Sequence, residues 1–284
     1  MDNRGDVCRR WMYSAGENSA VWQLMFTGNG RITGQKRNRK ERRSLFFSID
    51  ELSGQVLFDD YLLLDQATQQ AIGESWFTGM ETVSEQFVFL HAWQQNSPEH
   101  IGLWAVDPDT GSVEWARRDV VCCGMLDEGL LVYIPSVFAG FPERSYLIID
   151  PLTGIELRRP DNDTGAINAL RSAMRPETLR QNIILPDTVV EGSAEYGLIR
   201  DREPSVPAHC ECIVSGPLVA AAFHEFDERS GLWRSLLRIW WDMDICYEEI
   251  LAERSERPAV SSFLLRTGVL YYIRNETELI ALDV

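Results

Sequence analysis

The sequence has 284 residues, of which 45% are apolar, 10% aromatic and 25% charged. This composition excludes an intrinsically disordered chain, a collagen-like rod and a membrane-spanning bundle. Acidic residues outnumber basic ones by 43 to 27, and the resulting net charge of −16 disfavours binding to nucleic acid or to an anionic membrane.

The first ten residues contain no apolar core and no small-residue cleavage pattern, so they do not have the features of a secretion signal. No later stretch approaches the roughly 18 apolar residues that a spanning helix needs. We therefore predict a cytoplasmic protein without a membrane partner. In that compartment the six cysteines are expected to be mainly thiols, and their spacing indicates no disulfide framework.

A basic run is the first distinctive segment of the chain. Its charged residues are Lys36, Arg37, Arg39, Lys40, Arg42 and Arg43, with a single acid at Glu41. Because glycines precede it, we predict a hairpin loop or an edge strand. Two interpretations remain open: a solvated edge that resists aggregation, or a binding site for a small-molecule anion or an acidic protein.

A short pattern recurs along the chain: an apolar pair, Asp, a few residues, Ser or Thr, Gly, and an alternating run. Copies occupy 48–56, 105–115, 148–157 and 225–233, and residues 279–283 form the first half of another copy. Asp can accept bonds from the amides of a turn, and Gly supplies the positive φ that such a turn needs. Each copy is therefore predicted to be a β-hairpin.

The spacing of these copies predicts the architecture. The Asp residues lie about 57, 43, 77 and 56 residues apart, and the gap of about 77 suggests a degenerate copy between Pro160 and Asp201. Hairpin units of this length are typical of propeller blades, which stack because a single small sheet cannot bury both faces. We predict one all-β domain over residues 1–284. It is a propeller of about six four-stranded blades, with five to seven as the range. In such a ring the N- and C-terminal strands share a blade, and the first 10 to 20 residues are otherwise a candidate peripheral segment.

Other segments fit this scheme. Apolar runs at 87–93, 129–134, 218–223 and 268–273 are predicted to be inner strands. Helical spacing of apolar residues predicts a helical insertion near 164–181, and a second short helix is predicted at 247–254.

The copies at 105–115 and 148–157 resemble the blades of quinoprotein-type β-propellers, which repeat an apolar strand, Asp, a Thr-Gly turn and a strand bearing Trp. The stretch from Trp22 to Trp115 also resembles a family of bacterial propeller-like proteins that has no assigned activity, and this likeness covers about the first 160 residues. Both resemblances imply the fold, and neither implies a reaction.

Four segments carry side chains that could bind a ligand. Cys122 and Cys123 resemble the adjacent cysteines of quinoprotein dehydrogenases, but no calcium ligands accompany them, so a packed strand is the better interpretation. His209, Cys210 and Cys212 could ligate a metal, since Cys-x-Cys on a strand places both sulfurs on one face. The alternative is an ordinary structural strand.

Asp161 to Gly165 begins like a calcium loop but lacks the acidic residue at its last position, so a turn before a helix is favoured. His91 follows four apolar residues, and it is either a core histidine or a ligand group that faces a central channel.

The sequence contains no nucleophile elbow, phosphate loop, zincin helix or nucleotide fingerprint, and we predict neither a cofactor nor a catalytic group. The leading hypothesis is a non-enzymatic protein-interaction or scaffold module. The alternative is a small-molecule site, sensory or enzymatic, in the central channel of the propeller.

Overall fold

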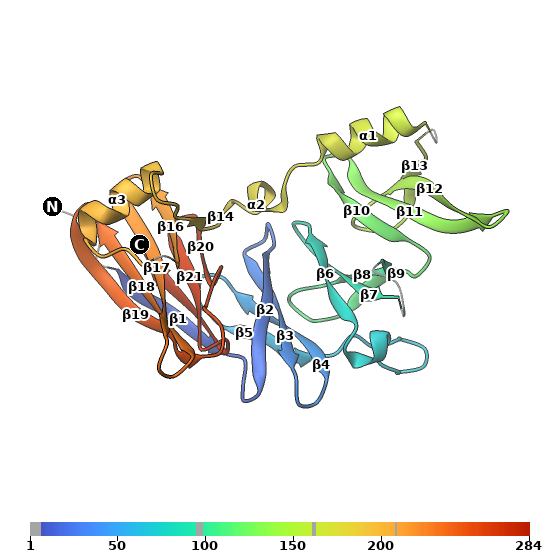
Figure 1. Ribbon diagram of the computed structural model, residues 1–284. Helices are drawn as coiled ribbons and strands as arrows, with labels where there is room; N and C mark the ends of the chain where they lie inside the picture. Colours follow the sequence, from blue (N-terminus) through green and yellow to red (C-terminus); the bar gives the residue numbers. More distant parts are fainter. Residues whose placement is uncertain (1–6, 95–98, 161–162, 208) are drawn as a thin grey trace. The chain divides into compact units, whose positions relative to one another are not determined.

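The computed structural model describes residues 7–94, 99–160, 163–207 and 209–284. It is all-β, with five antiparallel sheets of four or five strands each (Figure 1). Contacts divide the chain into two compact units. One unit is Asn18–Gln181, and the other joins Met1–Glu17 to Asn182–Val284. The single-domain organisation stays a prediction.

The Asn18–Gln181 unit contains three four-stranded sheets that follow one another along the chain. The first has strands β2 (Ser19–Phe26), β3 (Arg31–Asn38), β4 (Arg43–Asp50) and β5 (Val56–Tyr61). The second has β6 (Thr78–Val83), β7 (Val88–Trp93), β8 (His100–Val106) and β9 (Val113–Arg117), preceded by a short 3-10 turn, η1 (Ile72–Ser75). The third has β10 (Val121–Leu126), β11 (Gly129–Phe138), β12 (Phe141–Ile149) and β13 (Glu156–Arg158).

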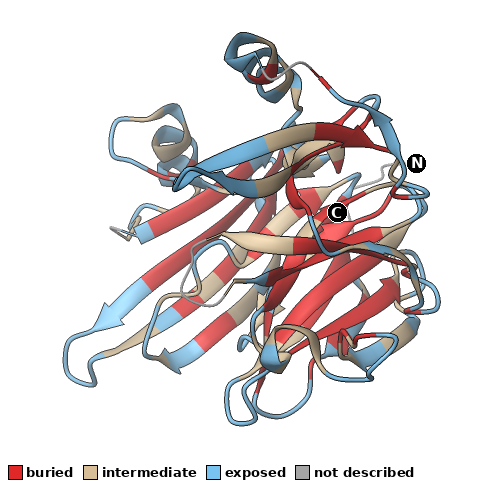
Figure 2. Ribbon diagram, turned by 90° about the vertical axis from the view of Figure 1, so that its right-hand side faces the viewer, coloured by how far each residue is buried: buried red, intermediate tan, exposed pale blue. Residues whose placement is uncertain are grey.

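Within this unit each sheet packs on the next one. Met25 and Phe46 of the first sheet share a buried cluster with Leu90 of the second. Phe89, on the other face of the same strand, packs with Leu130 of the third sheet. β7 is buried on both faces, and its sequence is therefore mainly apolar, as in other inner strands. Figure 2 shows that buried residues lie along the middle of the strands and exposed residues at the loops. The two helices that follow are α1 (Thr164–Ala173) and α2 (Glu177–Arg180).

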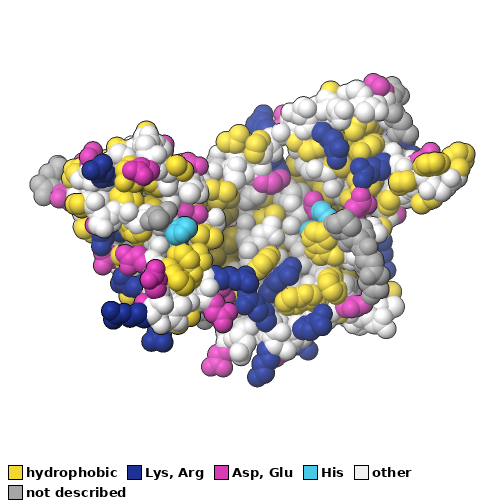
Figure 3. Space-filling view, in the orientation of Figure 1, with side chains coloured by type: hydrophobic (Ala, Val, Ile, Leu, Met, Phe, Trp, Pro, Cys, Tyr) yellow, Lys and Arg dark blue, Asp and Glu magenta, His cyan; other side chains and the backbone are white. Residues whose placement is uncertain are grey.

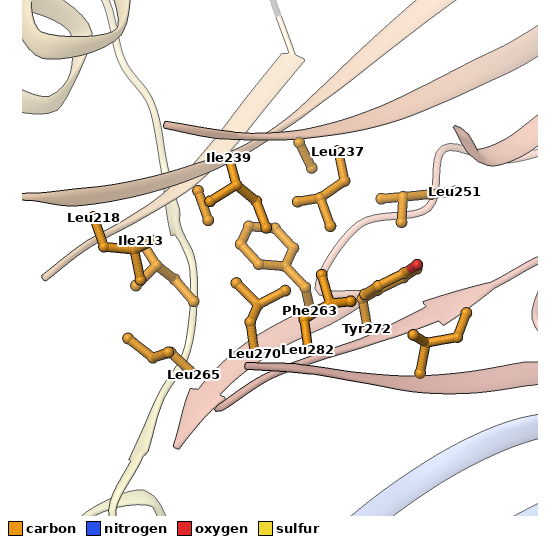
Figure 4. Close-up of a cluster of buried hydrophobic side chains, with 13 residues drawn as sticks. Ile213, Leu218, Leu237, Ile239, Leu251, Phe263, Leu265, Leu270, Tyr272 and Leu282 are labelled. Atoms are coloured by element: carbon orange, nitrogen blue, oxygen red, sulfur yellow. The ribbon is translucent and has the colours of Figure 1, made fainter. Parts of the chain in front are cut away.

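The second unit contains two sheets and helix α3 (Ala194–Arg202). One sheet has β15 (Asp187–Thr188), β16 (His209–Ser215), β17 (Leu218–Asp227), β18 (Leu232–Trp241) and β19 (Asp244–Ser255). The other has β14 (Ile183–Ile184), β20 (Phe263–Arg266), β21 (Val269–Arg274), β22 (Glu278–Asp283) and β1 (Cys8–Ser14). Figure 4 shows the common core of these two sheets. In it, Leu237 and Ile239 of β18 point toward Leu270 of β21 and Leu282 of β22.

The two ends of the chain share a sheet, as predicted. β1 pairs with β22 in antiparallel register, from Cys8 opposite Asp283 to Ser14 opposite Glu278. The carboxylate of Asp283 also accepts from the Arg10 guanidinium. Residues 8–14 are therefore an integral strand of a sheet, and the prediction that the first residues are peripheral is wrong for this segment.

The four complete copies of the repeated pattern form the predicted hairpins. In each, the Gly amide donates to the Asp carbonyl at 2.8–2.9 Å, and the Gly φ lies between 68° and 75°. They join β4 to β5, β8 to β9, β12 to β13 and β17 to β18. A further loop of this kind starts at Asp65, where Gln69 takes the place of Gly with a φ of 58° and donates to the Asp65 carbonyl. The sequence pattern did not reveal this loop.

Two predicted elements are wrong, and both lie outside the repeats. The segment from 160 to 201 contains helices and two-residue strands instead of a degenerate hairpin copy, so its described residues form no sheet of their own. The helical insertion predicted near 164–181 is confirmed by α1 and α2. Residues 247–254 belong to β19, because pairing with β18 outweighs a weak helical preference of the sequence. The predicted inner strands are all confirmed, as β7, β11, β17 and β21.

Candidate functional site

Three neighbouring strands of the second sheet bring together Glu81, His91 and His100. Glu81 Oε2 lies 2.8 Å from His91 Nδ1 and 2.6 Å from His100 Nδ1. One donor atom from each of the three residues lies within 4.8 Å of the others. Within the described ranges, this is the one cluster of three or more His, Cys, Asp or Glu groups with such convergence.

Two irregularities in strand pairing lie at this cluster. On β6, Met80 pairs with Leu90 and Thr82 pairs with Phe89, so Glu81 has no partner residue on β7. On β8, the register shifts again opposite His91. Such bulges change the direction of a side chain and are frequent beside functional sites. They place Glu81 against both imidazoles.

Small and aromatic neighbours fix the position of His91. Gly79 lies opposite His91 on β6, and a Cβ at this glycine would be only 2.8 Å from His91 Nε2. The Trp93 ring lies 5.3 Å from the His91 ring and 4.9 Å from the His100 ring. The His91 imidazole thus has room only because residue 79 has no side chain.

Electrostatics keep the Glu81 carboxylate charged in spite of its burial. Burial raises the pKa of Glu81, but the close contacts with His100 and His91 outweigh this effect and hold the pKa below its usual value. The contact with Glu81 in turn raises the pKa of His100 against the effect of burial, and the nearby Glu99 adds to the rise. Glu81 therefore contributes a negative charge between the two imidazoles.

The donor set fits a divalent transition-metal ion. Glu81 Oε2, His91 Nδ1 and His91 Nε2 are buried, and none has a hydrogen-bond partner with acceptable alignment in the part of the chain described. Glu81 Oε2 lies at contact distance from His91 Nδ1 and His100 Nδ1 without the alignment of a hydrogen bond, and a cation held between these atoms would satisfy all three. Two imidazoles and a carboxylate are a ligand set for Zn²⁺ and for Fe²⁺. Bond lengths near 2.0–2.1 Å would separate tetrahedral donors by about 3.3 Å, so the contacts of 2.8 and 2.6 Å from Glu81 Oε2 must lengthen by about 0.5–0.7 Å when an ion binds.

The basic run does not form one patch. Lys36 lies on β3, between β2 and β4, and its buried ammonium contacts Asp59 Oδ1 at 2.7 Å and Asp60 Oδ1 at 2.8 Å. The Arg37 guanidinium lies between the rings of Trp22 and Trp76, at 4.8 and 5.0 Å, and burial lowers its pKa. These two residues belong to the packed structure, which the sequence did not predict.

The remaining bases lie at the tip between β3 and β4. Arg39, Arg42 and Arg43 are exposed there, and Arg43 pairs with Glu41 at 3.2 Å. Figure 3 shows Lys and Arg side chains gathered over the region of β2 to β4. The predicted hairpin loop is confirmed for this part of the run, whereas the alternative of an edge strand is wrong because β3 and β4 are inner strands.

His209, Cys210 and Cys212 are not brought together. They alternate along β16, where Cys210 and Cys212 are buried in an apolar cluster and His209 is exposed against Trp233. Burial raises the pKa of Cys210 to about 12 and that of Cys212 to about 11. Both thiols share a face as predicted, but the histidine points to the opposite face, so the structure does not support a metal site there.

Cys122 and Cys123 lie on β10. Cys122 is buried among apolar side chains, and burial raises the pKa of both thiols, that of Cys123 to about 11. Of the loop at Asp161–Gly165, residues 161 and 162 lie outside the described residues. Asp163 accepts a bond from Ala166 N at 3.1 Å and so caps α1, as a turn before a helix requires.

Sequence reasoning found His91 but missed Glu81 and His100. Glu81 and His100 lie on β6 and β8, the two strands that flank β7. The pairing of Trp93 with His100 brings His100 close to His91. A detectable signal was available, because His91 and His100 are separated by a short connection between two apolar runs. Such a hairpin places them on adjacent strands.

Comparison with known proteins gives one match to a family model and distant similarities to solved structures. Residues 28–115 match a family described as a domain of unknown function (DUF4905). This stretch lies within the region for which the sequence indicated a family resemblance, while no quinoprotein repeat is matched. No curated protein matches the chain.

Two solved structures are distantly similar. An acylaminoacyl peptidase from Pyrococcus horikoshii is 9% identical with a TM-score of 0.30, and the match covers 90% of this chain but only 36% of the peptidase. A proposed glycosidase from Bacteroides thetaiotaomicron is 8% identical with a TM-score of 0.33, covering 95% of this chain and 88% of the other. Separately, no helix among the described residues is long and apolar enough to cross a bilayer.

Proposed function

We propose that this protein binds a divalent transition-metal ion through Glu81, His91 and His100. The observation that supports the proposal most strongly is the convergence of buried donor atoms that lack aligned hydrogen-bond partners. Three protein ligands leave a coordination position for water or for a bound molecule. This develops the small-molecule alternative drawn from the sequence, in which His91 was the candidate ligand group.

Each residue has a distinct part in this proposal. Glu81 provides the negative charge that favours a cation over a neutral molecule. His91 is held between Gly79 and Trp93, so it presets the site. His100 is the most exposed of the three and is the side chain that can move to admit the ion.

A metal titration tests the proposal. The full chain is stripped with a chelator and titrated with Zn²⁺ and with Co²⁺, and the bound metal is then measured by elemental analysis. We expect one ion per chain, with a loss of at least about tenfold in affinity for Glu81→Gln and His100→Gln. His209→Gln is the matched control, because His209 lies on the other unit and should leave the affinity unchanged. No stoichiometric ion, or equal affinity in all variants, would refute the proposal.

A protein-interaction role has support from a different feature. Arg39, Lys40, Arg42 and Arg43 form an exposed basic tip on a chain with a net charge of −16. Such a tip favours an acidic protein segment as partner. Replacing the three arginines by Gln should abolish binding of a polyglutamate peptide, and unchanged binding would exclude this tip. Lys36 and Arg37 must stay, because they are packed in the fold.

We also infer that the five sheets are the blades of one β-propeller. The order of the sheets along the chain, their stacking within each unit and the pairing of β1 with β22 support this inference. A crystal structure tests it, and any arrangement of the sheets other than a ring would refute it.

A further inference from the structure

A cavity of about 400 Å³ lies between β12 and α1 in the Asn18–Gln181 unit. Its volume falls in the range of sites that bind small molecules. It is lined by Arg144, Ser145 and Tyr146 from β12 and by Thr164, Asn168 and Arg171 from α1. The lining thus combines two guanidinium groups with hydroxyl and amide groups.

The walls of this cavity are held by packing. Leu170 of α1 and Met174, which follows the helix, pack with Tyr146 and Cys123 against the core of the third sheet. The Arg144 guanidinium lies 4.8 Å from the centre of the Tyr133 ring, a cation–π arrangement that fixes its orientation. The two arginines are therefore presented from elements whose positions are set before a ligand arrives.

One of the two guanidinium groups at the cavity is already in an ion pair, and the other is in none with the described residues. Arg144 Nη2 bonds to Glu99 Oε1 at 2.8 Å, and both groups are about half exposed. Within the described part of the chain, no carboxylate lies within salt-bridge distance of Arg171. Glu143 also lines the cavity, so its two guanidinium groups face two acids, Glu99 and Glu143, and Arg171 is the one without a salt bridge to either. Figure 3 shows Lys and Arg side chains at the surface below α1.

We propose that this cavity binds a small organic oxyanion, a phosphate or a carboxylate carried by a hydroxylated molecule. The planar guanidinium of Arg171 matches such a group in a bidentate geometry. Arg144 can add a second bond by exchanging its exposed partner Glu99 for the ligand. The hydroxyl groups of Tyr146 and Thr164 and the amide of Asn168 are placed to bond the rest of the molecule. This site is separate from the metal cluster and goes beyond the proposed function.

Calorimetry with defined probes tests the proposal. The full chain is titrated in the presence of a chelator with glucose 6-phosphate, inorganic phosphate, malonate and glucose, so that no metal contributes. We expect saturable binding of at least one of the three anions and none of glucose. Phosphate and malonate separate a phosphate site from a carboxylate site.

Variants of the helix decide whether the cavity is responsible. Arg171→Gln should weaken anion binding at least about tenfold, and Arg171→Lys should restore part of it, since it keeps the charge but loses the fork. Arg175→Gln is the matched control, because Arg175 is exposed near the same helix, contacts Asp127 and does not line the cavity. Absence of saturable anion binding, or equal weakening by Arg175→Gln, would overturn the proposal.

Discussion

The close approach between Gly79 and His91 makes a sharp test of the metal cluster. In Gly79→Ala, the added Cβ would lie 2.8 Å from His91 Nε2 and 3.0 Å from His91 Cε1. Ordinary contacts begin near 3.4 Å, so the imidazole must retreat by about 0.6 Å. Metal–ligand distances tolerate only about 0.2 Å. We therefore expect the affinity for Zn²⁺ to fall by between about 10-fold and 100-fold.

The assay is a competition titration of Zn²⁺ against a chromophoric chelator, with thermal unfolding of the metal-free protein as a check on folding. Gly197→Ala is the control, because no atom lies within 4 Å of its Cβ position and α3 favours alanine. If Gly79→Ala folds and binds Zn²⁺ as tightly as the natural chain, His91 is not a ligand in the position described. If it does not fold, His100→Gln provides the same test at a more exposed position.

Three further predictions concern the rest of the chain. Gln69→Gly should raise the free energy of unfolding in urea by about 0.5–1 kcal/mol, because Gln69 adopts a positive φ that glycine adopts without strain; a lower value would contradict this. Hydrogen bonds from Ser53 lower the pKa of Asp50. The loss of unfolding free energy caused by Asp50→Asn should therefore be full above about pH 4 and should vanish as the pH falls through the pKa of Asp50 in the folded protein. If the natural chain and the variant differ in stability by the same amount down to about pH 2, the bonds contribute nothing. At pH 8, iodoacetamide should label the exposed Cys8 well before Cys123, as peptide mass spectrometry would show. The pKa of Cys123 is about 11, so only about one Cys123 thiol in a thousand is ionised at this pH. Equal labelling rates would be incompatible with the burial of Cys123.

The hairpins were predictable because their chemistry is local. Between Asp50 and Gly54, for example, the carboxylate accepts from Ser53 and the Gly amide returns to the Asp50 carbonyl. All the groups involved lie within five residues, so the sequence shows them together. The loop at Asp65 uses the same bonds but places Gln69 at the positive φ, and a search that requires glycine misses it.

The number of sheets could not be predicted from spacing alone. The gap between Asp150 and Asp227 was interpreted as two hairpin units, whereas the described residues between 163 and 202 fold mainly into helices. Spacing measures chain length between markers, and a helical insertion contributes length without adding strands. A helix was expected from the apolar residues of α1, yet the hidden hairpin was inferred from the same gap, so the two predictions competed for the same residues.

The candidate site depends on strand register, which explains why only one of its three residues was identified. Regular alternation predicts which face a residue occupies but not where pairing shifts by one residue. The shift that leaves Glu81 unpaired on β6, together with the shift opposite His91 on β8, is a product of packing between whole strands. Each bulge costs ladder hydrogen bonds, and two of them converge on the same three side chains. The first strand pairs of the other two sheets of this unit shift in the same way, between Val21 and Gln23 and between Cys122 and Gly124. The shift therefore belongs to the repeated sheet, and the second sheet differs in the side chains that lie at it, a glutamate and two histidines.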